Sequence, residues 1–320
     1  MSVEVSYMAV VLDLFGDVDM RAAAQASYRL RPTAEFGFDS TLLATVRGVL
    51  QQFGRLPVVV GSGLEHTPEL LTELSRLAPL CGTGADNLAA LFDTPAVFAA
   101  LQKKGLHHVP ETRVTPPPSQ SAWLIKRRGM SGGSHVRSAP AQLECDDYYQ
   151  RRLDGAVISG LYCAGPAHCA LLGVNQMLSY RGVGAGQYIY QGATTWRAVP
   201  SALQQACAAL GARVAVECRL SGVFGLDFVV NDDHTPALID INSRPPATLA
   251  LYPLRAAVFR AHVTATDWIS EQHSSLDPEG DSAHLILYAE QTWQVPHGFS
   301  WPAAASDRPF DGEIIERGSP

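Results

Sequence analysis

The stretch Gly225-Leu-Asp-Phe-Val-Val-Asn-Asp-Asp-His-Thr-Pro-Ala-Leu-Ile-Asp-Ile-Asn-Ser-Arg-Pro-Pro246 holds two short apolar runs separated by polar turn formers. The first run carries Asp227, and the second carries Asp240 and leads into Asn242. Two such runs joined by a polar turn predict a β-hairpin. Side chains alternate along a strand, so Asp240 and Asn242 share one face, and closure of the hairpin can bring Asp227 opposite them.

These three side chains predict a magnesium site, because Mg²⁺ prefers oxygen ligands and commonly shares them with substrate phosphates. The alternative is an ordinary polar face on a solvated strand. Asp and Asn are poor strand formers, and here they alternate with leucine and isoleucine just before Arg244-Pro-Pro. We therefore interpret Asp227, Asp240 and Asn242 as metal ligands and not as polar residues on a solvated strand face.

The string Asp240-Ile-Asn242-Ser-Arg244-Pro245 resembles the magnesium-binding end of ATP-grasp enzymes, whose usual pattern is acidic-x-Asn-x-Arg-Pro. The position of Asp227, thirteen residues before Asp240, also agrees. The resemblance implies an α/β protein with the ATP-grasp fold. An N-terminal parallel α/β lobe is expected at 1–95. A small nucleotide-binding subdomain at 96–150 and a C-terminal subdomain at 151–320, both α+β, would clasp the nucleotide.

Composition narrows the class of protein. With 320 residues, 47% of them hydrophobic and 17% charged, the chain suits two or three packed lobes and is not expected to be disordered. A net charge of −7 without a basic block argues against nucleic-acid binding. No apolar run approaches the roughly 20 residues that span a bilayer, and no secretory signal is visible. Six cysteines without a Cys-x-x-Cys pair predict free thiols in a cytoplasmic protein rather than a zinc site.

Apolar runs and turn residues predict the other elements. In the first lobe, buried strands at 9–15 and 56–61 alternate with helices at 20–28 and from Thr67 onward, which predicts a parallel sheet. The turn Gly61-Ser-Gly63 either cradles an anion at the helix start or is a tight connection. Further helices are expected at 93–104, ended by Gly105, and at 201–210, ended by Gly211. Later strands are expected at 156–163, 170–176 and 284–290.

The segment after residue 122 predicts a nucleotide site. An apolar run ends at Lys126, and a loop with three glycines follows. Glycine lets backbone amides approach phosphate oxygens, and lysine adds a positive charge. In ATP-grasp enzymes this pattern holds the nucleotide-contacting lysine and the phosphate loop, and 148–155 resembles the adenine hinge. The resemblance thus assigns nucleotide contacts to Lys126, Ser131, Gly132, Gly133, Ser134, Gln150, Arg151 and Leu153. At least one of Arg127 and Arg128 is expected to be a surface charge.

Two positions depart from the family. Thr94 stands where many ATP-grasp enzymes have a lysine, and Val157 stands where many have a glutamate for the ribose. These departures weaken the case for conventional ATP binding and leave the metal trio untouched. Tyr188 and Tyr190 follow the Gly-rich stretch 182–186, which is either a mobile cover for substrate or a plain surface loop.

The resemblance implies an ATP- and Mg²⁺-dependent ligase that joins a carboxylate, such as that of glutamate, to an amine through an acyl phosphate. Its partners would be these small molecules and, in a homodimer, a second copy of the chain. Arg244 is expected to clamp the acyl phosphate, with an ion pair to Asp240 as the alternative. The chain as a whole resembles the tyramine–glutamate ligases of methanofuran-type one-carbon cofactor synthesis. The other readings are a nucleotide-binding regulatory protein without turnover and a small-molecule kinase.

Overall fold

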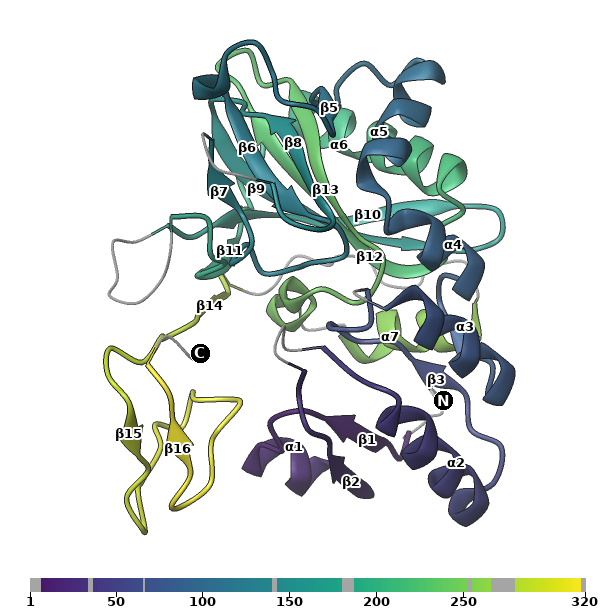
Figure 1. Ribbon diagram of the computed structural model, residues 1–320, viewed down its shortest axis with the longest axis vertical. Helices are drawn as coiled ribbons and strands as arrows, with labels where there is room; N and C mark the ends of the chain where they lie inside the picture. Colours follow the sequence, from purple (N-terminus) through teal and green to yellow (C-terminus); the bar gives the residue numbers. More distant parts are fainter. Residues whose placement is uncertain are drawn as a thin grey trace. The chain divides into compact units, whose positions relative to one another are not determined.

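The computed structural model describes residues 7–33, 37–65, 67–139, 143–179, 187–252, 255–265 and 280–317. The described residues divide into two compact units. The first contains those before residue 57 and those after residue 286, and the second contains those between (Figure 1). This division does not decide the boundaries predicted after residues 95 and 150, which stay predictions.

The first unit joins the two ends of the chain. Strands β1 (Val10–Asp13) and β2 (Ala26–Arg29) pair in parallel. Two short strands near the C-terminus, β15 (Trp293–Gln294) and β16 (Ile314–Ile315), pair with each other. The carboxylate of Asp19 accepts hydrogen bonds from the backbone of residues 307 and 308, at 3.1 and 3.0 Å. The helices of this unit are α1 (Val18–Ala23) and α2 (Thr41–Phe53).

The helix predicted at 20–28 is therefore wrong in its second half. Helix α1 ends at Ala23, and the following residues form β2. Tyr28 prefers a strand, and pairing in register with β1 gives the segment backbone partners that an isolated helical turn lacks. The pairing is parallel here, as expected, and again between β3 (Val58–Val59) and β4 (Leu80–Cys81) in the second unit. The strands expected to share one sheet, at 9–15 and 56–61, instead belong to these two separate two-stranded sheets.

The second unit is built around two larger sheets. The first has six antiparallel strands in the order β13-β12-β9-β10-β11-β14, and the second has four in the order β5-β8-β6-β7 (Figure 1). The strands of the six-stranded sheet are β9 (Ala156–Ala164), β10 (Cys169–Met177), β11 (Gly192–Thr195), β12 (Gly222–Val230), β13 (Pro236–Asn242) and β14 (Ala283–Leu285). Those of the four-stranded sheet are β5 (Thr112–Arg113), β6 (Trp123–Arg127), β7 (Arg137–Ser138) and β8 (Asp147–Arg151). The helices are α3 (Pro68–Leu77), α4 (Ala85–Leu91), α5 (Thr94–Lys103), η1 (Gln120–Ala122), α6 (Ser201–Glu217), η2 (Ala247–Leu251) and α7 (Arg255–Thr264).

Both faces of the six-stranded sheet are covered. Alternate side chains such as Phe224 and Phe228 pack with α5 and α6 in one core cluster. The intervening side chains, such as Leu161 and Val223, pack with η2 and α7 in a second. The alternation follows from the strand period of two and explains why these strands are apolar almost throughout. The predicted strands at 156–163 and 170–176, the hairpin at 226–241 and the helix ended by Gly105 are confirmed. The strand predicted at 284–290 shortens to β14.

The helix predicted to end at Gly211 continues through that residue to Glu217. The reason for the glycine is close approach: a Cβ on Gly211 would lie 2.1 Å from the Tyr162 ring. That ring is fully buried, stacks on Phe224 and donates a hydrogen bond of 2.9 Å to the Cys207 carbonyl. Gly211 thus lets α6 lie directly on β9 and is not a helix stop.

His262 of α7 is held in a narrow slot. Its Nδ1 accepts a hydrogen bond of 2.9 Å from the backbone N–H of Val223, so the neutral ring carries its proton on Nε2. A Cβ on Gly82 or Gly222 would lie 2.4 or 2.3 Å from the ring. Burial lowers the pKa of His262 from 6.5 to about 4. Protonation of Nδ1 would break the bond to Val223 and place a charge in this buried slot.

No helix among the described residues is long and apolar enough to cross a membrane. All six cysteines lie among the described residues, and none of them forms a disulfide.

Replacing Gly211 by Ala is expected to lower the free energy of unfolding by about 1–3 kcal/mol, because the new methyl group overlaps the Tyr162 ring. Gly48→Ala in α2 is the control, since nothing lies within 4 Å of that position. It should raise stability by up to about 1 kcal/mol. Calorimetric unfolding measures both. Equal shifts in the two variants would contradict the packing argument.

The His262 slot predicts a pH dependence of stability. Between pH 6.5 and about 4, His262 binds a proton in the unfolded chain but not in the folded protein. The stabilisation is therefore complete above pH 6.5 and is lost as the pH falls through that window, by about 3 kcal/mol. Asp17 and Asp227, whose pKa values rise to about 6, contribute the opposite slope. The measurement is thus the difference between unmodified protein and His262→Asn in urea titrations at pH 7 and 4.5. A difference that does not change with pH would refute the prediction.

Candidate functional site

A row of polar side chains crosses one face of the six-stranded sheet. The register places Asp240 of β13 opposite Asp227 of β12, Asp227 opposite Ser159 of β9, and Ser159 opposite Asn175 of β10. Directly opposed residues of antiparallel strands point to the same face. Asn175 is fully buried; its amide donates to the Ser159 carbonyl at 3.2 Å and accepts from the Tyr252 hydroxyl at 2.8 Å. A row of polar residues therefore runs across this otherwise apolar sheet and ends at two carboxylates, those of Asp227 and Asp240.

The predicted metal trio comes together at the end of this line. Asn242 lies two residues beyond Asp240, and its Nδ2 donates to Asp227 Oδ2 at 3.1 Å. Burial, and next the negative charge of Asp240, raise the pKa of Asp227 to about 6, against hydrogen bonds from Ser159 and Asn242 and the charge of Lys126. Among the described residues no group of three His, Cys, Asp or Glu side chains is placed for a metal. The amide oxygen of Asn242 and the carboxylates of Asp227 and Asp240 together give three side chains with oxygen ligands. The two carboxylates suit a hard divalent cation.

A β-bulge in the hairpin lies beside these carboxylates, and its backbone carbonyl accepts hydrogen bonds from side chains of the other sheet. Asp227 pairs with Asp240 but Phe228 pairs with Leu238, so Ile239 is the extra residue of β13. The carbonyl of Ile239 accepts a hydrogen bond of 3.0 Å from Lys126 Nζ of β6 and one of 3.5 Å from Gln150 Nε2 of β8. Lys126 and Gln150 are thus brought to the metal trio, although β6 and β8 belong to the other sheet.

Gln150 carries the clearest sign of a ligand at this place. Its side chain is 2% exposed, and its Oε1 has no hydrogen-bond partner among the described residues. A buried acceptor without a partner is costly, and a bound molecule with an N–H or O–H donor would satisfy it. Gln150 is one of the residues predicted to contact the nucleotide, and an N–H group of the base would be such a donor.

Arg151 and Leu153, the other predicted hinge residues, lie differently. Arg151 is on the opposite face of β8, with its guanidinium 5.8 Å from the centre of the Trp123 ring. Its backbone N–H donates to the Glu111 carbonyl at 2.8 Å. Leu153 follows β8 and is partly buried. The side chain of Arg151 therefore packs on Trp123, away from the face of β8 on which Gln150 lies.

The predicted phosphate loop, Ser131–Ser134, is held by backbone contacts. Gly132 and Gly133 have positive φ angles of 72° and 80°. The Gly132 carbonyl accepts from the backbone N–H of Tyr190 at 2.9 Å, and a Cβ on Gly133 would lie 1.9 Å from the Tyr188 carbonyl oxygen. Tyr188 and Tyr190 therefore touch this loop. The stretch 182–186, predicted as a cover or a plain loop, lies outside the described residues.

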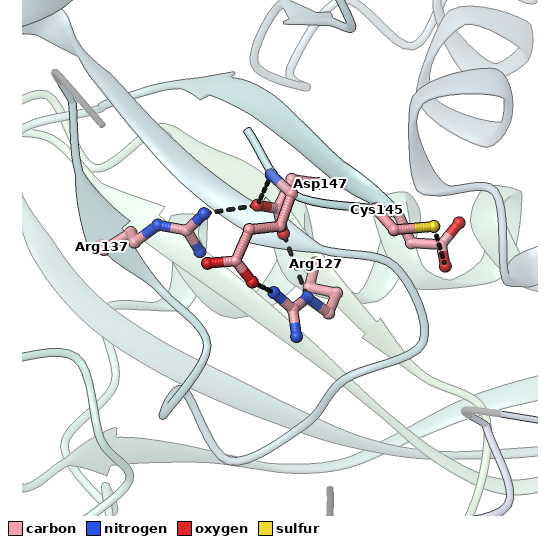
Figure 2. A network of polar contacts seen from close by, with 6 residues as sticks. Arg127, Arg137, Cys145 and Asp147 are labelled. Carbon is pink, nitrogen blue, oxygen red and sulfur yellow. Dashed lines mark hydrogen bonds and ion pairs between the residues drawn. The ribbon is translucent and has the colours of Figure 1, made fainter. Parts of the chain in front are cut away.

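The base of the same loop is fixed by an ionic network. The side chain of Asp147 has no exposed surface and bonds to Arg127 on β6 and Arg137 on β7, the strands that enter and leave the loop (Figure 2). Arg127 also pairs with Glu144. Burial would raise the pKa of Asp147, but hydrogen bonds from the Glu144 amide and the two arginines hold it below its ordinary value. Arg128 instead pairs with Asp93 at 3.0 Å. Both arginines that follow Lys126 are therefore held in ion pairs, at side-chain exposures of 23% and 16%, and neither is a free surface charge.

Arg244 has a partner that sequence did not predict. Its Nε donates to Glu65 Oε1 at 2.5 Å, and Glu65 Oε2 accepts from the Gly63 backbone N–H at 2.7 Å. The expected alternative for Arg244, an ion pair with Asp240, is not formed. The turn Gly61-Ser-Gly63 thus already holds an anion, the carboxylate of Glu65. Asp240, Asn242, Arg244 and Glu65 all line one pocket.

The structure also describes Thr94 and Val157, the two positions that depart from the ATP-grasp pattern. The Thr94 hydroxyl is hydrogen-bonded to Tyr148, which is buried and feels the charge of Asp240. Thr94 also lines the pocket. Val157, near the start of β9, is 43% exposed. Neither position supplies the charge that the family pattern has there.

Sequence reasoning missed Ser159, Asn175 and Glu65. Ser159 and Asn175 had a signal, because each is a polar residue at a central position of an apolar strand. Glu65 had none, because its role depends on a contact with a residue 179 positions away.

Comparison with known proteins concerns the fold. A family model described as an ATP-grasp domain matches residues 93–248. An ATP-grasp superfamily protein from Archaeoglobus fulgidus is 15% identical with a TM-score of 0.60, and the match covers 97% of this chain and 99% of that chain. The comparison with curated proteins finds no match in sequence.

Two enzymes of known reaction are also similar in structure. L-amino acid ligase from Bacillus licheniformis is 11% identical with a TM-score of 0.65, covering 91% of this chain and 82% of that chain. Biotin carboxylase from Campylobacter jejuni, in a beta-gamma-ATP complex, is 11% identical with a TM-score of 0.69, covering 96% of this chain and 78% of that chain. Identities this low show the fold, and the predicted fold class is confirmed.

Asp147→Asn is expected to lower the free energy of unfolding by about 2–3 kcal/mol, because it leaves Arg127 and Arg137 without their shared buried anion. Asp154→Asn is the matched control. Its side chain is 88% exposed and pairs only with Arg152, so the change should be below about 0.5 kcal/mol. Chemical denaturation measures both variants. Similar small effects would show that the network does not hold β6, β7 and β8 together.

Proposed function

Residues 93–248 match an ATP-grasp domain within a chain of that fold, and from this premise we propose that the protein is an ATP-dependent ligase that joins a carboxylate to an amine. The observation that carries the proposal is the convergence of two facing carboxylates, Lys126 and a buried acceptor without a partner. A purely structural polar cluster would leave neither a pair of facing anions nor an orphaned acceptor. Both are satisfied by Mg²⁺ and a nucleotide.

Asp227, Asp240 and Asn242 would hold the magnesium ion. When bound, the ion neutralises phosphate charge and orients the phosphoryl group. Lys126 adds a second positive charge, and Gly132 and Gly133 let the loop backbone approach phosphate oxygens. Gln150 offers its free acceptor to the base. The network around Asp147 keeps the two strands of the loop in fixed positions.

Arg244 is the proposed clamp for the activated acid. In the first step, a carboxylate oxygen attacks the terminal phosphorus of ATP, and the bond to ADP breaks. In the second, the amine nitrogen attacks the acyl carbon, the carbon–oxygen bond to phosphate breaks, and an amide and inorganic phosphate result. Phosphoryl transfer relies mainly on positioning and charge, so no nucleophilic side chain is required. Guanidinium groups match carboxylate and phosphate oxygens in pairs.

The finer proposal concerns the substrates. On the resemblance to tyramine–glutamate ligases, the acid is an amino acid such as glutamate, and the amide belongs to the synthesis of a methanofuran-type one-carbon cofactor. The similarity of fold to an L-amino acid ligase supports an amino-acid carboxylate as the acid. A homodimer in solution is part of the same proposal.

A second candidate function is a nucleotide-binding protein without turnover. The observation that favours it is the loss of charge at Thr94 and Val157, which removes two contacts expected for ATP. A kinase on the same fold is the third candidate, and it would give a stable phosphorylated product without an amine.

The proposal predicts ADP release and hydroxamate formation when Mg-ATP, hydroxylamine and a panel of amino acids are mixed with the protein. Hydroxylamine traps an acyl phosphate, so the natural amine need not be known. Asp240→Asn should reduce the rate about 100-fold or more with folding intact, because it removes one carboxylate of the metal site. Asp232→Asn, in the exposed hairpin turn, is the control and should keep full activity.

Each other outcome identifies a different function. ADP with a phosphorylated product that hydroxylamine does not trap indicates the kinase. A melting shift with Mg-ATP but no ADP across the panel indicates the binding protein. ADP and hydroxamate that persist in Asp240→Asn would contradict the assigned metal site.

A further inference from the structure

A series of hydrogen bonds leads to the metal trio and has no part in the steps of the proposed reaction. It begins at Tyr252, the residue after η2, whose hydroxyl donates to Asn175 Oδ1 at 2.8 Å. The amide of Asn175 donates in turn to the Ser159 carbonyl at 3.2 Å. The Ser159 side chain is hydrogen-bonded to Asp227, one of the three proposed metal ligands. The series therefore crosses β10 and β9 and reaches the metal site on β12.

Stability alone does not account for the three residues that lead to Asp227. The exposed fractions of Tyr252, Asn175 and Ser159 are 4%, 0% and 3%, so each polar group has lost its hydration. Other side chains on this face of the sheet, such as Leu161, are apolar. Apolar residues of the same shape in place of a buried hydrogen-bonded pair can leave stability nearly unchanged or raise it. What the polar residues add is a directed contact with Asp227.

Two glycines make room for this arrangement. A Cβ on Gly173 of β10 would lie 2.0 Å from the Tyr252 hydroxyl oxygen, so glycine is needed for that hydroxyl to reach the row. A Cβ on Gly225 of β12 would lie 3.2 Å from Pro246, in the segment between the metal trio and η2. Residues 240–252 therefore carry two proposed metal ligands and also the hydroxyl at which the series begins.

The carboxylate of Asp227 has two hydrogen-bond donors. Asn242 Nδ2 donates to its Oδ2 at 3.1 Å, and the Ser159 hydroxyl provides the other hydrogen bond. An ionised carboxylate only accepts, so the serine oxygen is the donor. A carboxylate has about four acceptor sites, and these two donors leave the others for a cation. Hydrogen bonds of this kind hold a metal-ligating carboxylate in one orientation.

We propose that Ser159, Asn175 and Tyr252 are positioning residues for the metal site. Ser159 orients the Asp227 carboxylate towards the cation, Asn175 holds the Ser159 backbone, and Tyr252 holds the Asn175 amide. The inference rests on the proposed function, which assigns a divalent cation to the metal trio. Loss of a partner of this kind typically weakens metal binding by about 10- to 100-fold.

The test measures the affinity of the full chain for Mn²⁺ in the presence of ADP, with free Mn²⁺ read from its electron paramagnetic resonance signal. Mn²⁺ takes the same kinds of oxygen ligand as Mg²⁺. Ser159→Ala should weaken Mn²⁺ binding about 10-fold or more, because Asp227 loses the donor that orients it. Tyr252→Phe removes only a hydroxyl and should weaken binding about 3-fold or more, because the Asn175 amide can then turn away from Ser159.

Tyr162→Phe is the matched control for Tyr252→Phe. The Tyr162 hydroxyl donates to the Cys207 carbonyl at 2.9 Å, and the side chain is fully buried. Tyr162 lies on β9, three residues after Ser159, so its side chain points to the opposite face of the sheet. Each tyrosine variant loses one buried hydrogen bond, so thermal unfolding should report a similar loss of stability in both. Only Tyr252→Phe should lose Mn²⁺ affinity.

Two results would overturn the inference. One is an unchanged Mn²⁺ affinity in Ser159→Ala and Tyr252→Phe. The other is an equal loss of affinity in Tyr162→Phe and Tyr252→Phe, because reduced stability alone would then explain the effect. Unmodified protein that binds no Mn²⁺ with ADP would remove the metal site and the inference together.

The hydroxamate assay separates failure of this inference from failure of the ligase proposal. Hydroxamate formed by the unmodified protein, with unchanged Mn²⁺ affinity in the variants, would leave the ligase and remove the positioning role. Loss of Mn²⁺ affinity in Ser159→Ala and Tyr252→Phe alone, without hydroxamate from the unmodified protein, would leave the positioning role and remove the ligase.

Discussion

Two carboxylates that face each other across neighbouring strands are the constraint on which the candidate site depends. The antiparallel register of β12 and β13 sets Asp227 against Asp240, and burial makes their repulsion costly. The fold partly relieves this cost with hydrogen bonds from Ser159 and Asn242 and with the charge of Lys126. A divalent cation would relieve the remainder. The site is therefore unfavourable for folding and favourable for binding, as is common where a protein must hold a charged ligand.

The surroundings of this carboxylate pair are rigid for a physical reason. Apolar residues cover both faces of the six-stranded sheet, and the polar line from Asn175 to Asp240 runs through it with its groups hydrogen-bonded. A half-satisfied polar row would be less stable than an apolar one, so the row, like the core, specifies the register. Two side chains of the four-stranded sheet, Lys126 and Gln150, reach this region by hydrogen bonds to the carbonyl of the bulge residue Ile239.

Much of this could be predicted from local sequence. The hairpin, its metal trio, Lys126 and the glycine loop all carry signals within a few residues, and strand alternation places their side chains. The errors arose where a distant contact overrides a local pattern. Gly211 has the pattern of a helix end, but it admits the Tyr162 ring, and residues 26–29 continue a helical pattern but pair with β1. The partner of Arg244 could not be predicted, because Glu65 lies in a turn whose own sequence indicates only an anion or a tight connection.

The phosphate loop is joined to residues 188–190 through main-chain atoms: one carbonyl accepts from an amide, and Gly133 lies against another carbonyl. A contact of this kind does not depend on which side chains the joining segment carries. The Tyr188 hydroxyl adds a side-chain contact of 3.2 Å with Ser138 Oγ of β7, but the main-chain contacts do not require it. Position 133 has no room for a Cβ. The joining segment can therefore change its side chains while the main-chain contacts that hold the glycine loop stay the same.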